Sequence, residues 1–162
     1  MNKSIDKVCK QQNAAPPSLL KTILKLALEM GREGREGRKI GTIFTIGDLE
    51  KVLTYSRPLI LDPLQGHPDH LKKITDDDVK ETVKELAQLD GAFVVSKEGI
   101  VHSATRFLEA PTKGVQVPKG LGARHIAAAA ISLYTDAIAV TVSASSIIRV
   151  FDKGKVIGKF YS

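Results

Sequence analysis

The first pattern along the chain is a set of apolar residues at helical spacing. They are Leu20, Ile23, Leu24, Ala27 and Met30. A spacing of three and four residues places these side chains on one stripe of an α-helix, and Ser18 can cap its first turn. Such a stripe could lie on a membrane, but packing on a domain core is far commoner. We therefore expect a helix from residue 18 to about residue 31 that covers a core.

The residues before this helix form a different pattern. Residues 1–17 are mostly polar, offer at most a short helix, and end in Pro16-Pro17. No apolar signal-peptide segment follows Met1, and no stretch approaches the roughly 18 apolar residues of a transmembrane helix. We expect a polar N-terminal lead-in at 1–17, a single catalytic domain at 18–162, no membrane contact and a cytoplasmic protein.

Apolar runs predict the strands of a sheet. They cover 39–46, 92–95, 100–105, 137–142, 147–151 and 156–161. Short glycine-containing turns predict that 92–105 and 147–161 are hairpins. The nearly continuous apolar run at 137–142 is typical of a strand in the centre of a sheet.

Three further helices are expected from the local pattern. These are expected from Asp48 to Leu53, from Thr75 to Leu89 and from Ala123 to Tyr134. Asp48 and Thr75 are the expected capping residues, and the aspartates after Thr75 suit the positive end of a helix dipole better than a metal cluster. Helices alternating with strands predict one α/β domain, with a mixed central β-sheet flanked by α-helices.

Two segments resemble ligand sites only superficially. Residues 31–38, Gly-Arg-Glu-Gly-Arg-Glu-Gly-Arg, lack the Lys-Ser/Thr ending of a phosphate loop and precede a strand, so we expect a frayed helix end. Residues 55–74 form an irregular, proline-containing connection. His67 and His70 lie in this connection near two aspartates, but their spacing fits no standard metal site, and ordinary loop histidines are the better interpretation.

Composition narrows the range of partners. The 162 residues carry a formal net charge of +6, but the basic residues are dispersed among acidic ones, and aromatic residues make up only 5% of the chain. Dispersed charge and few stacking side chains make nucleic acid an unlikely partner, whereas an anionic small molecule remains compatible with the charge. The single cysteine, Cys9, cannot form an internal disulfide.

The first candidate for chemistry is Asp90-Gly91-Ala92, at a helix-to-strand junction. Glycine permits a tight turn there and lets a ligand approach the backbone closely. The carboxylate of Asp90 could bind a divalent ion or orient a hydroxyl nucleophile. From this tripeptide alone, a turn aspartate bonded to nearby amides is the simpler interpretation.

The second candidate is Gly120-Leu121-Gly122-Ala123-Arg124-His125, at the start of the helix rich in alanine. A helix amino end favours phosphate through its free N–H groups and dipole. Arg124 adds a fork of donors, and His125 adds a donor that titrates near neutral pH. A salt-bridged arginine and a capping histidine are the alternative. Ser143, after strand 137–142, is either a further phosphate contact or an ordinary turn serine.

These segments together resemble a known family, the catalytic domain of the diadenylate cyclases, which is also found at the front of the DNA-integrity scanning protein. Besides Asp90-Gly91-Ala92 and Arg124-His125, the resemblance includes the segment from Gly34 to Asp48. It covers 19–161, and the stand-alone soluble members of the family are the most similar. The family joins two ATP molecules into cyclic di-AMP and releases two pyrophosphates.

The resemblance implies a role for each candidate. Each subunit would hold one ATP, and two subunits would meet face to face as a homodimer, with a divalent metal (Mn²⁺, Mg²⁺ or Co²⁺) assisting. Asp90 would engage the ribose 3′-hydroxyl or the metal, and Gly91 and Ala92 would shape the nucleotide wall. Leu108 would lie against adenine. The expected phosphate contacts are Gly122, Arg124, His125 and Ser143.

The chain departs from the family pattern near the metal. Membrane-anchored members have a histidine where this chain has Leu89, and a glutamate pair where it has Ala144 and Ser145. Some members have threonine where this chain has Ala123 and Ala127. The metal ligands of those members therefore do not transfer to this chain. A module that binds ATP or cyclic di-AMP without turning it over remains the alternative function.

Overall fold

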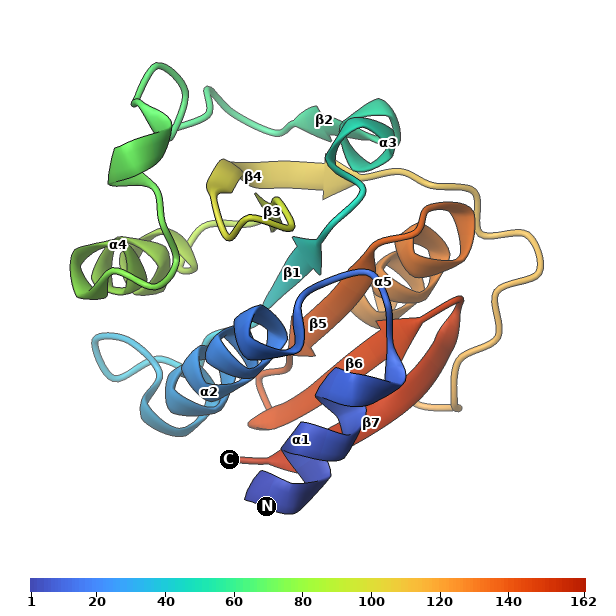
Figure 1. The fold of residues 1–162 in the computed structure, drawn as a ribbon. Coiled ribbons are helices and arrows are strands. Elements are labelled where there is room, and N and C mark those ends of the chain that lie inside the picture. The colour runs from blue at the N-terminus through green and yellow to red at the C-terminus, as the bar shows by residue number, and fades with distance from the viewer.

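The computed structural model describes residues 1–162, which are built around one seven-stranded sheet (Figure 1). The strands are β1 (Thr42–Ile46), β2 (Ser56–Pro58), β3 (Ala92–Val95), β4 (Val101–Leu108), β5 (Ile138–Val142), β6 (Ile147–Asp152) and β7 (Lys155–Tyr161). Their order across the sheet is β2-β4-β3-β1-β5-β6-β7. Only β1 and β3 pair in parallel, so the sheet is mixed, as the sequence predicts.

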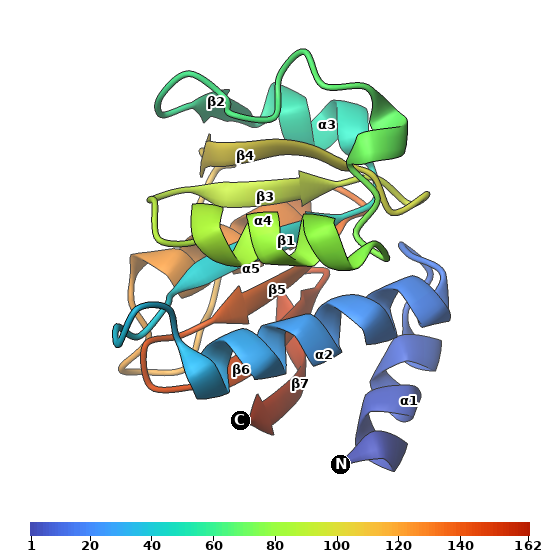
Figure 2. The ribbon, with the colours of Figure 1, turned by 90° about the vertical axis from the view of Figure 1, so that its left-hand side faces the viewer.

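Helices cover both faces of this sheet (Figure 2). One face carries α1 (Asn2–Gln11), α2 (Pro17–Glu33) and α4 (Asp77–Leu86), and the other carries α3 (Leu49–Thr54) and α5 (Ala123–Tyr134). A 3₁₀ helix, η1 (Asp69–Leu71), lies in the connection between β2 and α4. The predicted α/β class is confirmed. None of the helices combines the length and apolarity that crossing a lipid bilayer requires.

Two hydrophobic clusters lie on the two faces. The larger one contains the buried face of α2 and the strand residues beneath it, including Phe44 and Phe93, whose rings stack with centroids 5.2 Å apart. Helix α1 adds Ile5, Val8 and Cys9 to this cluster, so the segment expected as a polar lead-in packs on the same core. The smaller cluster lies under α3 and α5 and consists mainly of alanine.

Most predicted elements are present, but several helix starts differ. Helix α2 begins at Pro17 with Pro16 as its N-cap, so Ser18 as the cap is wrong; proline fits the first helical turn because its missing N–H would have no partner there. Helix α4 begins at Asp77 after Asp76, and Thr75 is not its cap. Asp48 does precede α3, but its carboxylate accepts a hydrogen bond from the amide of Asp136 instead of capping the helix.

The strands differ from prediction mainly at their ends. β1 begins at Thr42 and not at residue 39, and β4 continues to Leu108 through a bulge beside β3. The short strand β2 was not expected from the sequence; it pairs with the end of β4 inside the segment interpreted as irregular. The predicted central position of 137–142 is confirmed, because β5 lies between β1 and β6 and is buried throughout.

Candidate active site

The predicted site residues converge at one edge of the sheet. β1 and β3 both begin at this edge because they are parallel, while β4 and β5 end there because they run the other way. The α4–β3 junction and the start of α5 lie at the same edge, on the left of Figure 2. Segments far apart in the sequence are thereby brought together.

A cavity of about 290 Å³ opens at this edge, and we call it the central cavity. Its lining includes five of the predicted site residues, namely Asp90, Gly91, Ala92, Leu108 and Arg124. Leu108 is buried at the end of β4, whereas Asp90 and Arg124 are exposed to solvent. The cavity therefore combines an apolar wall with one carboxylate, Asp90, and the guanidinium groups of Arg124 and Arg106, a combination that suits a nucleotide.

Gly91 is essential to the shape of this cavity. Its φ of 108° is in the region that favours glycine, and a Cβ there would lie 2.5 Å from the carbonyl carbon of Thr105 on β4. The Oγ1 of Thr42 on β1 also lies 3.4 Å from the carbonyl oxygen of Gly91. The junction is thus held tightly between two strands, and Asp90 is fixed at its outer end.

Asp90 has no ion-pair partner within the chain, and no amide of the turn donates a hydrogen bond to its carboxylate. The simpler interpretation of this residue, a turn aspartate bonded to local amides, therefore has no support in the structure. The free carboxylate belongs to the lining of the cavity and is available to a ligand.

Arg124 lies over the backbone at the start of β1. A Cβ on Gly41 would lie 2.6 Å from its Nη1 and 2.7 Å from its Cζ, so the absence of a side chain on Gly41 provides the space for the guanidinium. Gly122 is the N-cap of α5 and places Arg124 in the first helical turn. Arg124 has no carboxylate partner, so its donors remain free for an anion.

The structure does not bring His125 or Ser143 into the lining of the cavity. His125 is 7% exposed, and Nη1 of Arg149 on β6 lies 3.3 Å from its Nε2. Burial, followed by the charges of Arg149 and Arg124, lowers the pKa of His125 and favours the neutral ring. The hydroxyl of Ser143 bonds to Ser145 at 2.7 Å. Gly122 is also outside the lining, so phosphate contacts by these three residues stay predictions.

A second cavity of about 280 Å³ adjoins the first, and we call it the basic cavity. It shares Gly41, Asp90 and Arg124 with the central cavity, so the two cavities adjoin at these residues. Its own lining adds Arg38 and Lys39 before β1, the end of α4 and the turn after β5.

Comparison with known proteins assigns the family. Residues 29–156 match the family model of the DisA bacterial checkpoint controller nucleotide-binding domain, the DAC domain. This chain belongs to the DAC family. A diadenylate cyclase of Methanocaldococcus jannaschii is 58% identical over 85% of this chain and 44% of its own length. One of Haloferax volcanii is 41% identical over 88% of this chain and 52% of its own length. The DAC chain described here thus spans about half the length of these curated relatives.

Solved structures share the fold. DacA from Staphylococcus aureus, crystallised as a double cysteine mutant, matches with a TM-score of 0.61 at 23% identity, over 90% of this chain and 87% of that one. A hypothetical membrane spanning protein from Bacillus cereus matches with a TM-score of 0.62 at 22% identity, over 83% of this chain and 60% of that one. At this identity the likeness establishes the DAC fold.

Asp90 is the only carboxylate in the lining of either cavity of this DAC domain, and no cluster of three or more His, Cys, Asp or Glu side chains is placed to hold a metal. Leu89 and Ala144, two of the positions at which the sequence departs from the expected family pattern, both line the basic cavity. A Mg²⁺-type ion is commonly held by one or two carboxylates together with substrate phosphates and water. The residues present therefore fit an ion held by Asp90 jointly with a nucleotide.

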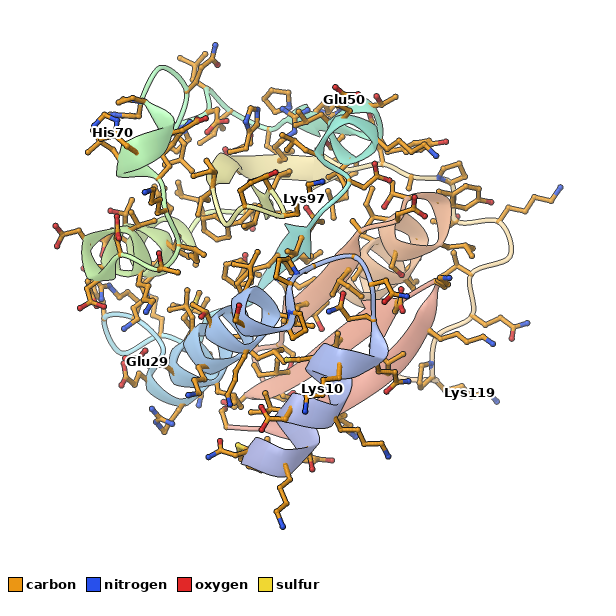
Figure 3. The ribbon with its side chains drawn as sticks, in the orientation of Figure 1. Lys10, Glu29, Glu50, His70, Lys97 and Lys119 are labelled. Atoms are coloured by element: carbon orange, nitrogen blue, oxygen red, sulfur yellow. The ribbon has the colours of Figure 1, made fainter.

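Sequence reasoning missed part of the cavity wall. The additional lining residues include Gly41, Ile43, Leu59, Arg106 and Phe107. The guanidinium of Arg106 is held in the cavity wall, because it donates to Oγ of Ser56 at 2.9 Å and to the carbonyl of Ser56 at 3.0 Å. It is therefore less available to an anion than the guanidinium of Arg124. Only Gly41, a glycine directly before a strand, carried a local signal that could have been used. The exposed Lys119, on the loop before α5, lines neither cavity and extends away from the molecule (Figure 3).

Proposed function

We propose that this chain is a diadenylate cyclase, a nucleotidyltransferase that joins two ATP molecules into cyclic di-AMP and releases two pyrophosphates. The observation that supports this most strongly is the central cavity, where Asp90, Arg124, Ala92 and Leu108 line one space. The names of the two curated relatives support the same activity.

ATP would lie with its adenine against Leu108 and its α-phosphate near Arg124. The 3′-oxygen of each ATP attacks the α-phosphorus of the other, so two O3′–P bonds form in all, and at each α-phosphorus the bond to the oxygen that bridges to the β-phosphorus breaks. One pyrophosphate leaves from each ATP with the electron pair of the broken bond, and each hydroxyl proton passes to a carboxylate oxygen of Asp90 in the subunit beside it or to water. A divalent ion bound by Asp90 and the phosphates would neutralise charge; Mg²⁺, Mn²⁺ and Co²⁺ are the candidates.

The reaction requires two nucleotides in opposite orientations, and each chain offers one central cavity. We therefore propose a face-to-face homodimer as the active form, because alignment of two bound nucleotides removes much of the entropic barrier. Free donors on Arg124 and the positive charge of the basic cavity would offset repulsion between the two triphosphates.

The deciding experiment is to incubate the purified protein with ATP and, separately, each of the three metals, and to identify the products by mass spectrometry. Cyclic di-AMP with two equivalents of pyrophosphate is the expected result, and its rate per chain should rise with protein concentration where dimers form. ATP that binds but remains unchanged with every metal, in a protein shown to be dimeric, would instead favour the non-catalytic binding module.

A further inference from the structure

The segment before β1 separates its basic residues into two groups. Arg35 donates to Glu85 at 2.9 Å and to Glu81 at 3.2 Å, so its charge is neutralised on α4. Arg38 and Lys39 have no carboxylate partner, and both line the basic cavity. Arg35 therefore has a structural role, whereas Arg38 and Lys39 are cations that line the basic cavity.

The geometry of this segment is fixed from both ends. The amides of Arg35 and Arg38 each donate to the carbonyl of the other at 2.9 Å, which closes a tight turn. Arg35 anchors this turn to α4, and Nζ of Lys39 donates to Oγ of Ser146, in the β5–β6 turn, at 3.0 Å. The backbone of Arg38 and the ammonium group of Lys39 are thus held beside the cavity by contacts to separate elements.

Charge in the basic cavity is strongly unbalanced. Arg38, Lys39 and Arg124 contribute three positive groups, and Asp90 contributes the single negative one. Gln88, just after α4, adds a neutral amide whose Nε2 donates to the carbonyl of Glu85 at 3.2 Å. Guanidinium and ammonium groups gathered around a concave surface are suited to several phosphate oxygens at once.

We propose that the basic cavity binds the β- and γ-phosphates of the nucleotide, the part that leaves as pyrophosphate. This inference rests on the proposed function and extends it to Arg38 and Lys39. Arg124 lines both cavities, so a nucleotide with its base in the central cavity and its α-phosphate at Arg124 directs its remaining phosphates toward Arg38 and Lys39. Asp90 is the only carboxylate here that could hold a metal ion, so Arg38 and Lys39 supply further positive charge to offset that of the triphosphate.

The test compares ligands that differ only in phosphate content. Titration calorimetry on the full chain would measure ATP, AMP and inorganic pyrophosphate, each with the same divalent metal, for wild type, Arg38→Ala and Lys39→Ala. Each variant should bind ATP and pyrophosphate roughly tenfold more weakly and AMP with unchanged affinity, because loss of one charge-assisted contact has an effect of this size. The double variant should lose more than either single one.

Two control variants each remove one positive charge at a residue outside the basic cavity. Arg32→Ala deletes an exposed arginine of α2, and Lys97→Ala deletes a lysine at the opposite end of β3, labelled in Figure 3; neither residue lines the basic cavity. Both controls should keep ATP and pyrophosphate affinity. Ser146→Ala removes the hydrogen bond to Lys39 and that from Ser146 to the carbonyl of Gly31, but it retains the charge of Lys39, so its effect on ATP affinity should be smaller than that of Lys39→Ala.

The outcomes separate this inference from the proposed function. Equal losses for ATP and AMP in Arg38→Ala and Lys39→Ala, unchanged ATP affinity, or equal losses in the Arg32 and Lys97 controls would each overturn the subsite, even if cyclic di-AMP is formed. Selective loss of ATP and pyrophosphate binding in a protein that forms no cyclic di-AMP would uphold the subsite and reject the cyclase. Thermal unfolding of each variant confirms that the measured protein is folded.

Discussion

The two faces of the sheet are built from different residues. The face under α1, α2 and α4 holds 29 buried hydrophobic residues, most of them large, whereas the face under α3 and α5 holds 13, more than half of them alanine. Charges on the first face are paired: Nζ of Lys84, a residue 8% exposed, lies 2.9 Å from Glu29 and 3.2 Å from Glu81. Hydrogen bonds to these carboxylates raise the pKa of Lys84.

Polar groups on the α5 face are less completely satisfied. Arg149 is 9% exposed and has only His125 as a side-chain partner, and the hydroxyls of Thr45 and Thr141 are buried without a hydrogen bond. Small alanine side chains let α5 lie close to the sheet, which brings Arg124 over Gly41. The comparison indicates that the α2 face supplies most of the stability, and that the α5 face gives up part of it to position the candidate site.

The largest expected effect on folding comes from the α2 face. Leu24→Ala should lower the free energy of unfolding by about 2–5 kcal/mol, because a fully buried leucine leaves a cavity. Ala129→Gly, at a fully buried site on α5, should cost about 1–2 kcal/mol from helix propensity and one lost methyl group. Urea unfolding measures both, and equal losses would contradict the proposed difference between the faces.

The next effect concerns turnover and not folding. Asp90→Asn should lower the rate of cyclic di-AMP formation by roughly 10²-fold or more while ATP still binds, because a carboxylate that orients a hydroxyl or a metal contributes about this much. Initial rates at saturating ATP measure it. Asp136→Asn, at an exposed aspartate outside both cavities, is the control and should keep wild-type turnover. Wild-type turnover in Asp90→Asn itself would remove Asp90 from the mechanism.

A smaller effect, on ATP affinity, is expected when the guanidinium of Arg124 is removed or displaced. Arg124→Ala should weaken ATP binding by roughly tenfold, since it removes a charge-assisted contact. Gly41→Ala should weaken binding in the same direction, because its Cβ would force the guanidinium to move while keeping the charge. Equilibrium ATP titration measures both variants, and unchanged affinity in both would place Arg124 outside the nucleotide site.

The smallest effect is a pH dependence of stability. The pKa of His125 is lowered in the folded protein, so between its ordinary value of about 6.5 and the lowered value the unfolded chain binds a proton that the folded chain does not. The contribution of this residue to stability should therefore fall as the pH falls through that window. His125→Gln should flatten the dependence in urea unfolding from pH 7 to pH 5, and His70→Gln, at an exposed histidine of η1, should preserve it (Figure 3). An unaltered pH dependence in His125→Gln would argue against a buried neutral histidine.

Local pattern was a good guide to the existence of elements and a poorer guide to their ends. The hairpins at β3–β4 and β6–β7 were predictable because each combines apolar residues with a short glycine turn. The starts of α2 and α4 were not, because several polar residues or prolines in succession can occupy the N-cap position. β2 was missed because three residues carry too little pattern, and its pairing with β4 is a tertiary contact.

The sequence by itself determined the fold class, the family and the position of Asp90 at a glycine turn, since these depend on residues that are neighbours in the chain. Tertiary structure alone decided which candidates meet. The parallel pairing of β1 and β3 brings Asp90 and Gly41 to one edge, and the close packing of α5 adds Arg124 there while it buries His125 against Arg149. Arg124 and His125 are adjacent in sequence, but successive helical residues point about 100° apart, so only the packing of α5 could show which one faces the cavity.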